Sequence, residues 1–179
     1  MGRIIYASLG SNLGDKLSNL SRAVGLIHSK VGSVSKISSI YMTPPWGFES
    51  DQDFFNICIQ IDSKLSPNEV LQAFNHIEDE LGRIRTSEPG YSSRLIDIDI
   101  LTIDSETIDS TELTIPHPKM QERYFVLLPL QEIANNFVHP VSTKTIQQLI
   151  QECPDESPYQ IHDFKISLKE TANLDRLGK

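Results

Sequence analysis

The stretch FFNICIQI at residues 54–61 alternates between two sets of side chains. One parity carries Phe55, Ile57, Ile59 and Ile61, and the other carries Phe54, Asn56, Cys58 and Gln60. Successive side chains of a β-strand point to opposite faces of the sheet. The stretch therefore predicts a strand with one face on the core and a second face available for ligands.

A helix and another strand are predicted after this stretch. Ser66-Pro67-Asn68-Glu69 combines an N-cap serine, a proline at the first helical position and a capping-box glutamate, which is typical of a helix start. Gly82 is expected to end the helix, residues 83–93 to form a flexible loop, and residues 95–103 to form a strand. The apolar stripe of the helix is Val70, Phe74, Ile77 and Leu81.

The residues before the stretch predict two strands with a helix between them. Residues 3–9 form an apolar run that is typical of a buried strand. Residues 34–43 predict the second strand, which Pro44-Pro45 ends because proline has no N–H to donate to a sheet ladder. The helix between them is expected over residues 15–30, and its apolar stripe is Leu17, Leu20, Val24 and Ile27.

The order strand, helix, strand, strand, helix, strand predicts an α+β fold with a ferredoxin-like βαββαβ core, one sheet and a C-terminal extension. Helices are expected to pack on one sheet face, which leaves the other for ligands. A turn and strand at 104–115 and helices at 120–134 and 143–152 are expected to extend this core. Residues 1–153 are predicted to form one domain, and residues 154–179 a loosely attached tail.

The composition is typical of a soluble protein of one domain. Of the 179 residues, 39% are hydrophobic and 22% are charged, and the apolar runs are shorter than the ~20 residues that cross a membrane. We expect Cys58 and Cys153 to be free thiols in a cytoplasmic protein, because they lack metal-type spacing and no signal peptide precedes them. The net charge of −8 argues against nucleic acid and membrane partners. We expect a monomer or a weak homodimer.

The strongest chemical signal is RLIDIDIL at residues 94–101. In a strand, Asp97 and Asp99 project from the same face at roughly 7 Å, while Ile96, Ile98 and Ile100 face the core. A hard cation relieves the repulsion of two carboxylates, and Mg²⁺ prefers one or two carboxylates together with water and phosphate oxygens. The alternative is a solvated sheet face that happens to carry two acids.

Arginines and a polar–aromatic pair surround these acids in the sequence. Arg83, Arg85 and Arg94 can bind phosphate oxygens through paired donors, so the sequence predicts a site for a magnesium-bound polyphosphate. Phe54 and Asn56 share one strand face, where a ring can stack on a flat heterocycle and a carboxamide can bond its edge. Taken singly, each of these residues is more often an ordinary surface or packing residue.

Other common catalytic devices are absent from the sequence. GSNLGDK at residues 10–16 has the wrong glycine spacing for a Walker phosphate loop, and no GxGxxG follows a strand. The five histidines are scattered, so zinc chemistry and a serine–histidine nucleophile have little support.

Several motifs together resemble the 6-hydroxymethyl-7,8-dihydropterin pyrophosphokinase family, over about residues 4–150. The ordered motifs are GSNLGD from Gly10, YMTPPWG from Tyr41, FFN from Phe54, ExxxGRIR from Glu78, RxxDIDIL from Arg94 and IPHPxMxxRxF from Ile115. The resemblance implies transfer of pyrophosphate from ATP to the pterin hydroxymethyl group, which gives AMP and the pterin diphosphate in folate biosynthesis. It implies two Mg²⁺ ions held by Asp97 and Asp99.

The resemblance also implies roles for individual residues. Arg83 and Arg94 would act with Asp97 and Asp99 in catalysis. The pterin would be held by Gly10, Thr43, Pro44, Trp46, Phe54, Asn56 and Phe125, with its ring between Phe54 and Phe125. ATP would be contacted by Glu78, Arg85, Arg94, Ile100, Thr114, His117 and Arg123. The loops at 44–53 and 83–93 would close over the substrates.

Two departures from the family pattern and two rival readings accompany this resemblance. The second loop carries Tyr91 where many relatives have a tryptophan, and Pro118 stands where an aromatic residue is common. A ferredoxin-like fold also serves as an RNA-binding module, with Tyr6 and Phe54 stacking on bases. The second rival is a regulatory domain that binds a small molecule without catalysis.

Overall fold

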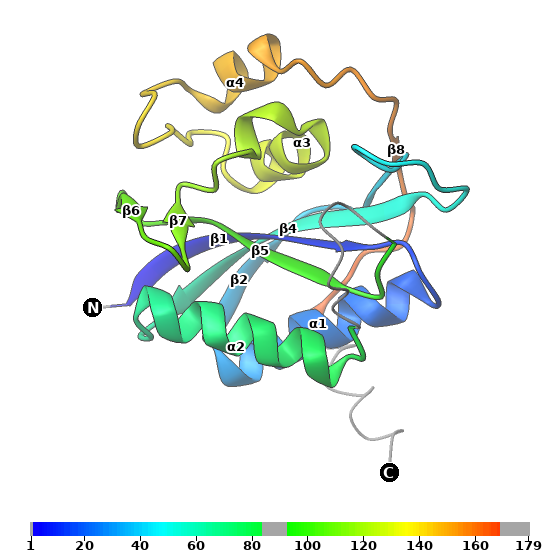
Figure 1. Ribbon diagram of the computed structural model, residues 1–179, viewed down its shortest axis with the longest axis horizontal. Helices are drawn as coiled ribbons and strands as arrows, with labels where there is room; N and C mark the ends of the chain where they lie inside the picture. Colours follow the sequence, from blue (N-terminus) through cyan, green and yellow to red (C-terminus); the bar gives the residue numbers. More distant parts are fainter. Residues whose placement is uncertain (1, 84–92, 169–179) are drawn as a thin grey trace.

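The computed structural model describes residues 2–83 and 93–168 as an α+β fold built on one main antiparallel sheet (Figure 1). The strands of the fold are β1 (Arg3–Ser11), β2 (Ser33–Ile37), β3 (Tyr41–Thr43), β4 (Phe54–Ser63), β5 (Asp97–Ile103), β6 (Ile108–Asp109), β7 (Thr114–Ile115) and β8 (Gln160–Ile161). Its helices are α1 (Lys16–Lys30), α2 (Pro67–Glu80), the 3-10 turn η1 (Met120–Glu122), α3 (Tyr124–Ile133) and α4 (Ile146–Glu152).

The sheet has the strand order β5-β1-β4-β3-β8, and β2 also pairs with β4. β1 lies between β4 and β5 and is antiparallel to both. Each strand–helix–strand unit is therefore split by a strand of the other unit, as in the ferredoxin-like arrangement. The predicted fold class is confirmed.

Helices α1 and α2 cover one face of the sheet, below it in Figure 1. The predicted helix start is present: Ser66 accepts from the Glu69 N–H, and Glu69 reaches back to the Ser66 N–H in a capping box. Gly82 follows the helix with φ +87°, a conformation that favours glycine. The side chains of both predicted apolar stripes pack between the sheet and these two helices, in the hydrophobic cluster called the main core below.

Helix α3 covers part of the opposite face, and α4 packs on α3, which corrects the expectation that helices pack on one face alone (Figure 1). Their apolar side chains form a second cluster with Cys58 of β4 and Leu101 of β5. Cys58 and Cys153 are both free, as predicted, and both are buried. Only the part of this face that α3 leaves uncovered remains for a ligand.

Two predicted elements are interrupted in the structure. The strand expected over 34–43 is broken between β2 and β3, where the Ser38 hydroxyl accepts the Cys58 N–H at 3.0 Å in place of a ladder carbonyl. The helix expected over 120–134 is broken at Arg123, whose φ of −127° and ψ of 105° are extended. A hydrophobic period averages over several residues and does not resolve one non-helical position.

The expectation of a loosely attached tail is wrong for residues 154–168. β8 pairs with β3, and Ile166, which is 7% exposed, packs in the main core. In Figure 1 the chain after α4 runs from the α3 and α4 layer, past the sheet edge at β8, to the layer of α1 and α2.

The expected extension at 104–115 is present as the hairpin β6–β7. In the described part of the chain, no helix combines the length and apolarity that a membrane span requires.

Candidate active site

Strand register brings the predicted site residues of three strands into adjacent rows on the α3 side of the sheet. Gly10 of β1 pairs with Asn56 on one side and with Asp97 on the other. Ser8 pairs with Asp99 in the next row. Paired residues of antiparallel strands project from the same face, so the acid pair and the amide share one surface.

Gly10 leaves the space into which Asn56 projects. A Cβ at this position would lie 2.9 Å from Asn56 Oδ1 and 3.6 Å from Phe54 Cδ1. The first distance is shorter than van der Waals contact, so any larger residue would displace the amide. The glycine therefore permits the close approach of β1 to the Asn56 side chain.

A pocket of about 520 Å³, partly open to solvent, lies over these rows. It brings together all seven residues predicted for pterin binding, together with Arg94, Asp97, Asp99 and Arg123. Ser8 and Phe48 also line it, and the sequence analysis missed both. Ser8 is two residues from Gly10 on the same strand face, and Phe48 is an aromatic residue in the proline-bounded loop. Both could therefore have been predicted from the sequence as pocket residues.

Aromatic rings and one amide form the apolar end of the pocket. The Trp46 and Phe125 rings lie 6.4 Å apart, and the Phe48 and Phe54 rings 6.1 Å apart, both pairs edge to face. Asn56 is 3% exposed and donates from Nδ2 to Thr43 Oγ1 at 2.9 Å. This bond fixes the amide orientation. An apolar slot with one oriented amide suits a flat, polar-edged ligand.

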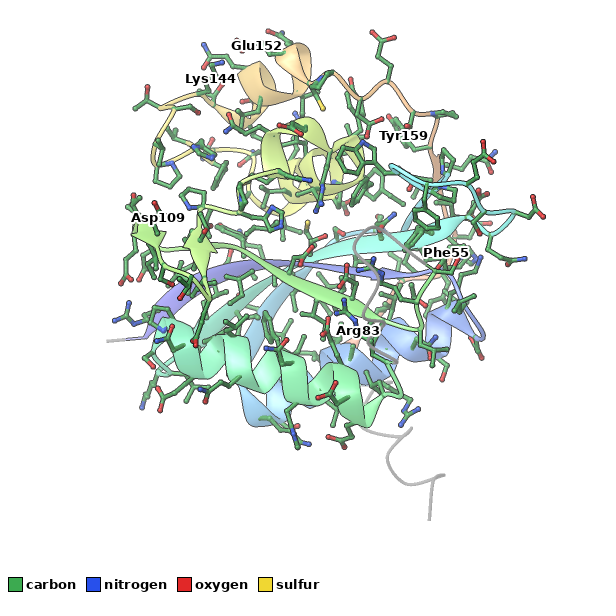
Figure 2. The ribbon with its side chains drawn as sticks, in the orientation of Figure 1. Phe55, Arg83, Asp109, Lys144, Glu152 and Tyr159 are labelled. Carbon is green, nitrogen blue, oxygen red and sulfur yellow. The ribbon has the colours of Figure 1, made fainter. Side chains whose placement is uncertain are left out.

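Carboxylates and arginines form the charged end of the pocket. Asp97 pairs through Oδ1 with Arg83 at 2.8 Å and through Oδ2 with Arg94 at 2.7 Å. Arg83 also pairs with Glu78, and Figure 2 shows Arg83 close to β5. Two guanidinium groups therefore meet at one carboxylate, and their donors can also bind phosphate oxygens.

Asp99 faces a different set of partners. Arg123 Nη1 lies 3.5 Å from Asp99 Oδ2, and His117 Nε2 lies 3.9 Å from the same atom. Burial and the charge of Asp97 raise the pKa of Asp99 to about 6. Burial and Arg123 lower the pKa of His117 to about 4, so the imidazole is neutral near pH 7. Because His117 Nδ1 accepts the Lys119 N–H, Nε2 carries the proton and acts as a donor.

The acid pair fits a magnesium ion by its chemistry. The charge of Asp97 on the same strand face contributes to the raised pKa of Asp99, and a divalent cation would offset that repulsion. Each carboxylate oxygen has two lone pairs, so Asp97 can accept an arginine N–H and still coordinate a metal. Among the described residues no cluster of three acidic, histidine or cysteine ligands occurs.

The remaining residues predicted to contact ATP lie in several places. The Glu78 side chain is buried on the helix side and accepts the Ile98 N–H at 2.7 Å. The Ile100 side chain is in the main core, so only its backbone, on the edge strand β5, can meet a ligand. Thr114 and His117 line a second, open pocket. Arg85 and Tyr91 lie outside the described residues. These assignments stay predictions.

Asn12 is a site residue whose role the sequence analysis missed. It is fully buried, and its Oδ1 accepts the Arg94 N–H at 2.7 Å while its Nδ2 donates to Ser93 Oγ at 2.9 Å. Its backbone N–H also bonds the Arg94 carbonyl. Asn12 thus fixes the backbone of Arg94. A local pattern gives no signal for this role, because the partner is 82 residues away.

Burial of Glu78 predicts a pH-dependent effect on stability. Burial raises the pKa of Glu78 to about 7, against 4.5 for an exposed glutamate. The folded protein therefore binds this proton more tightly, and the stability associated with it is lost as the pH rises from about 4.5 to 7. Glu78→Gln keeps an acceptor for the Ile98 N–H and does not titrate. We expect the variant to gain stability relative to wild type between pH 5 and pH 8, measured as urea midpoints without ligands.

Glu69→Gln is the matched control for this measurement. Glu69 is exposed and caps α2, and its pKa is lowered by the Ser66 hydroxyl and N–H. This glutamate is ionised at both pH 5 and pH 8, so its substitution should change stability equally at the two values. A Glu78→Gln difference that stays constant with pH would contradict the raised pKa.

The fold and the pocket define a ferredoxin-like α+β protein that binds small molecules on the ligand face of its sheet. The site joins an aromatic slot to a cluster of acids and arginines. Residues 6–135 match the family described as 7,8-dihydro-6-hydroxymethylpterin-pyrophosphokinase (HPPK), and the chain belongs to this family.

Individual relatives agree with this assignment. The 2-amino-4-hydroxy-6-hydroxymethyldihydropteridine pyrophosphokinase of Bacillus subtilis is 45% identical over 134 residues, which cover 74% of this chain and 79% of the relative. The protein of the same name from Porphyromonas gingivalis is 45% identical over 139 residues, which cover 76% of this chain and 94% of the relative.

Among solved structures, wild-type HPPK-DHPS of Plasmodium falciparum with SDX-DHP has a TM-score of 0.71 at 17% identity. The match covers 85% of this chain and 44% of that one, so this chain spans less than half of that longer protein. At this identity the likeness supports the fold alone.

Proposed function

We propose that this chain transfers pyrophosphate from ATP to 6-hydroxymethyl-7,8-dihydropterin, giving AMP and the pterin diphosphate for folate synthesis. The observation that carries the proposal is the single pocket in which the aromatic slot with Asn56 adjoins Asp97, Asp99 and Arg94. The pterin pyrophosphokinases that are 45% identical to the chain support the same reaction.

The pterin is proposed to occupy the aromatic end. Phe54 and Phe125, both lining the pocket, stack on the bicyclic ring, and Asn56 bonds its polar edge. The Asn56 amide is buried and oriented by Thr43. A ring lacking matching donors and acceptors would leave this amide unpaired, so the amide selects for the pterin edge.

The triphosphate is proposed to occupy the charged end. Asp97 and Asp99 would hold Mg²⁺, which would offset the negative charge of the phosphates. Arg94 and Arg123 line the pocket beside these acids, and neutral His117 offers its Nε2–H. Thr114 and the open pocket beyond His117 accommodate the nucleoside end.

Catalysis follows from positioning and charge. The pterin hydroxymethyl oxygen bonds to the β-phosphorus of ATP, the bond from that phosphorus to the α-bridging oxygen breaks, and AMP leaves while the hydroxyl proton passes to water. The arginines place guanidinium groups where negative charge grows on the transferring and leaving oxygens. A pterin stacked in the aromatic slot would displace the water there, which would otherwise compete as the acceptor.

The cellular setting is part of the same proposal. We propose a cytoplasmic enzyme that acts as a monomer or a weak homodimer.

The RNA-binding alternative has less support. Tyr6 packs edge to face against Phe137 at 6.1 Å, beside the α3 and α4 cluster, which limits stacking on a base. The second alternative, a binding domain without catalysis, would bind the substrates but release no AMP.

Product analysis tests the proposed function directly. The protein is incubated with ATP, Mg²⁺ and hydroxymethyl dihydropterin, and the nucleotides are separated by chromatography. We expect AMP in amounts equal to the pterin diphosphate formed, and only when the pterin is present. ADP would indicate transfer of a single phosphoryl group, and binding of both substrates without AMP would favour a regulatory domain. Either result would contradict the proposal.

A further inference from the structure

Helix α3 begins without a capping side chain of its own. Its N-cap residue is Arg123, which makes no side-chain cap hydrogen bond. The first N–H groups of a helix need acceptors, which serine, threonine, aspartate or asparagine usually supply from the N-cap position. An arginine side chain has donors only, so the acceptor must come from elsewhere.

The Arg123 side chain is directed to the pocket instead. It is 6% exposed, lies 3.5 Å from Asp99 Oδ2, and places its guanidinium 5.1 Å from the Trp46 ring centre and 5.6 Å from that of Phe125. Phe125 is the second residue of α3 and lines the same pocket. The first turn of α3 therefore carries two walls of the site.

Asp155 supplies the missing acceptor from the segment after α4. Its Oδ2 accepts the Tyr124 N–H at 3.0 Å, and its Oδ1 accepts the Ser157 N–H at 3.0 Å. The residue is 8% exposed, so both bonds are shielded from water. A carboxylate at a helix N-terminus is also favoured by the helix dipole. Asp155 lies beyond residues 6–135, the part that matches the family.

The same segment continues to the opposite side of the pocket. Tyr159, labelled in Figure 2, has its ring 5.7 Å from that of Tyr41 on β3. β8 then pairs Gln160 with Met42, next to Thr43, whose hydroxyl orients Asn56. One continuous stretch thus connects the start of α3 with the strand that holds the amide.

We propose that Asp155 is a positioning residue for the aromatic end of the pocket. Its carboxylate fixes the first turn of α3, and so places Phe125 and Arg123 opposite Phe54 and Asn56. Naming the pterin as the ligand of that end rests on the proposed function, but the placement of the walls does not.

Three variants and one control test this role. Asp155→Ala removes the acceptor, Asp155→Asn keeps one without charge, and Asp155→Glu keeps the charge but shifts the acceptor by one methylene. Glu156→Ala removes the adjacent, exposed carboxylate and serves as the control. Trp46 is the only tryptophan of the chain and lies beside Arg123 and Phe125, so its fluorescence reports wall placement without any substrate.

For Asp155→Ala we expect a shifted Trp46 emission in the ligand-free protein and about a tenfold higher KM for the pterin, which is the size of a lost helix cap. The KM for ATP should rise by at most about threefold, because only Arg123 among its proposed contacts is displaced, whereas Asp97 and Arg94 are on other elements. Asp155→Asn should show a Trp46 emission close to that of wild type and a pterin KM within about threefold of the wild-type value. Glu156→Ala should equal wild type in both measurements. Asp155→Glu should show the selective pterin effect, and it decides the outcome if Asp155→Ala does not fold.

Wild-type emission and wild-type pterin KM in Asp155→Ala, or in Asp155→Glu if the alanine variant does not fold, would overturn the proposal. Equal rises in both KM values would also overturn it, because they indicate a general loss of structure. Failure of the proposed function looks different. In that case wild type would release no AMP, while the substitutions at Asp155 would still shift the Trp46 emission.

Discussion

Replacing Asp97 or Asp99 with alanine is expected to reduce AMP release about a thousand-fold while the protein stays folded. Each substitution removes a carboxylate proposed to bind Mg²⁺, and electrostatic groups at a reacting centre contribute on the order of 10²–10³ in rate. Both side chains are partly exposed, at 24% and 36%, so their loss leaves no core cavity. Initial rates at saturating Mg²⁺ and ATP, with thermal melting as a folding check, measure the effect.

Metal-free ATP binding separates this explanation from a general loss of the site. Asp97→Ala leaves Arg83 and Arg94 without a carboxylate that both contact, so ATP binding in EDTA should not weaken. Asp62→Ala, an exposed acid at the far end of β4, is the control and should keep wild-type turnover. Wild-type turnover in Asp97→Ala or Asp99→Ala would contradict the proposal that these carboxylates bind Mg²⁺.

Asn56→Ala is expected to weaken pterin binding on the order of 50-fold and to leave ATP binding unchanged. The amide is 3% exposed and is held by Thr43, and losing a buried hydrogen-bonding partner costs about 1–3 kcal/mol. Titration calorimetry with each substrate separately measures the two affinities.

Gln60→Ala is the matched control for Asn56. Gln60 follows Asn56 by four residues on the same strand face, accepts the Tyr6 hydroxyl at 3.3 Å, and is outside the pocket lining. We expect it to leave both affinities unchanged. Equal losses for pterin and ATP in Asn56→Ala would contradict separate ends of the pocket.

The sequence predicted those parts of the fold that depend on local patterns. The alternation of residues 54–61 marks β4, and Ser66 with Glu69 marks the start of α2, because strand parity and helix capping act over a few residues. The break at Ser38 and the extended backbone of Arg123 depend on partners distant in sequence. No periodicity contains that information.

The same distinction between local patterns and distant partners applies to the residues of the site. Asp97 and Asp99 could be placed side by side because their spacing of two is a property of one strand. The position of Phe125 opposite Phe54 came from the family resemblance, since two different elements carry these rings. The roles of Asn12 and Asp155 had no local signal, because each acts through a backbone group far along the chain.

The pairing of Asp97, Gly10 and Asn56 across three strands has a geometric consequence. Neighbouring strands are about 4.8 Å apart, so the proposed cation site and the proposed position of the heterocycle edge are separated by two strand intervals, or roughly 10 Å. Backbone ladders set this span, and the surface loops contribute nothing to it. A change in the length of those loops would therefore alter how fast substrates enter and leave without changing the alignment of donor and acceptor.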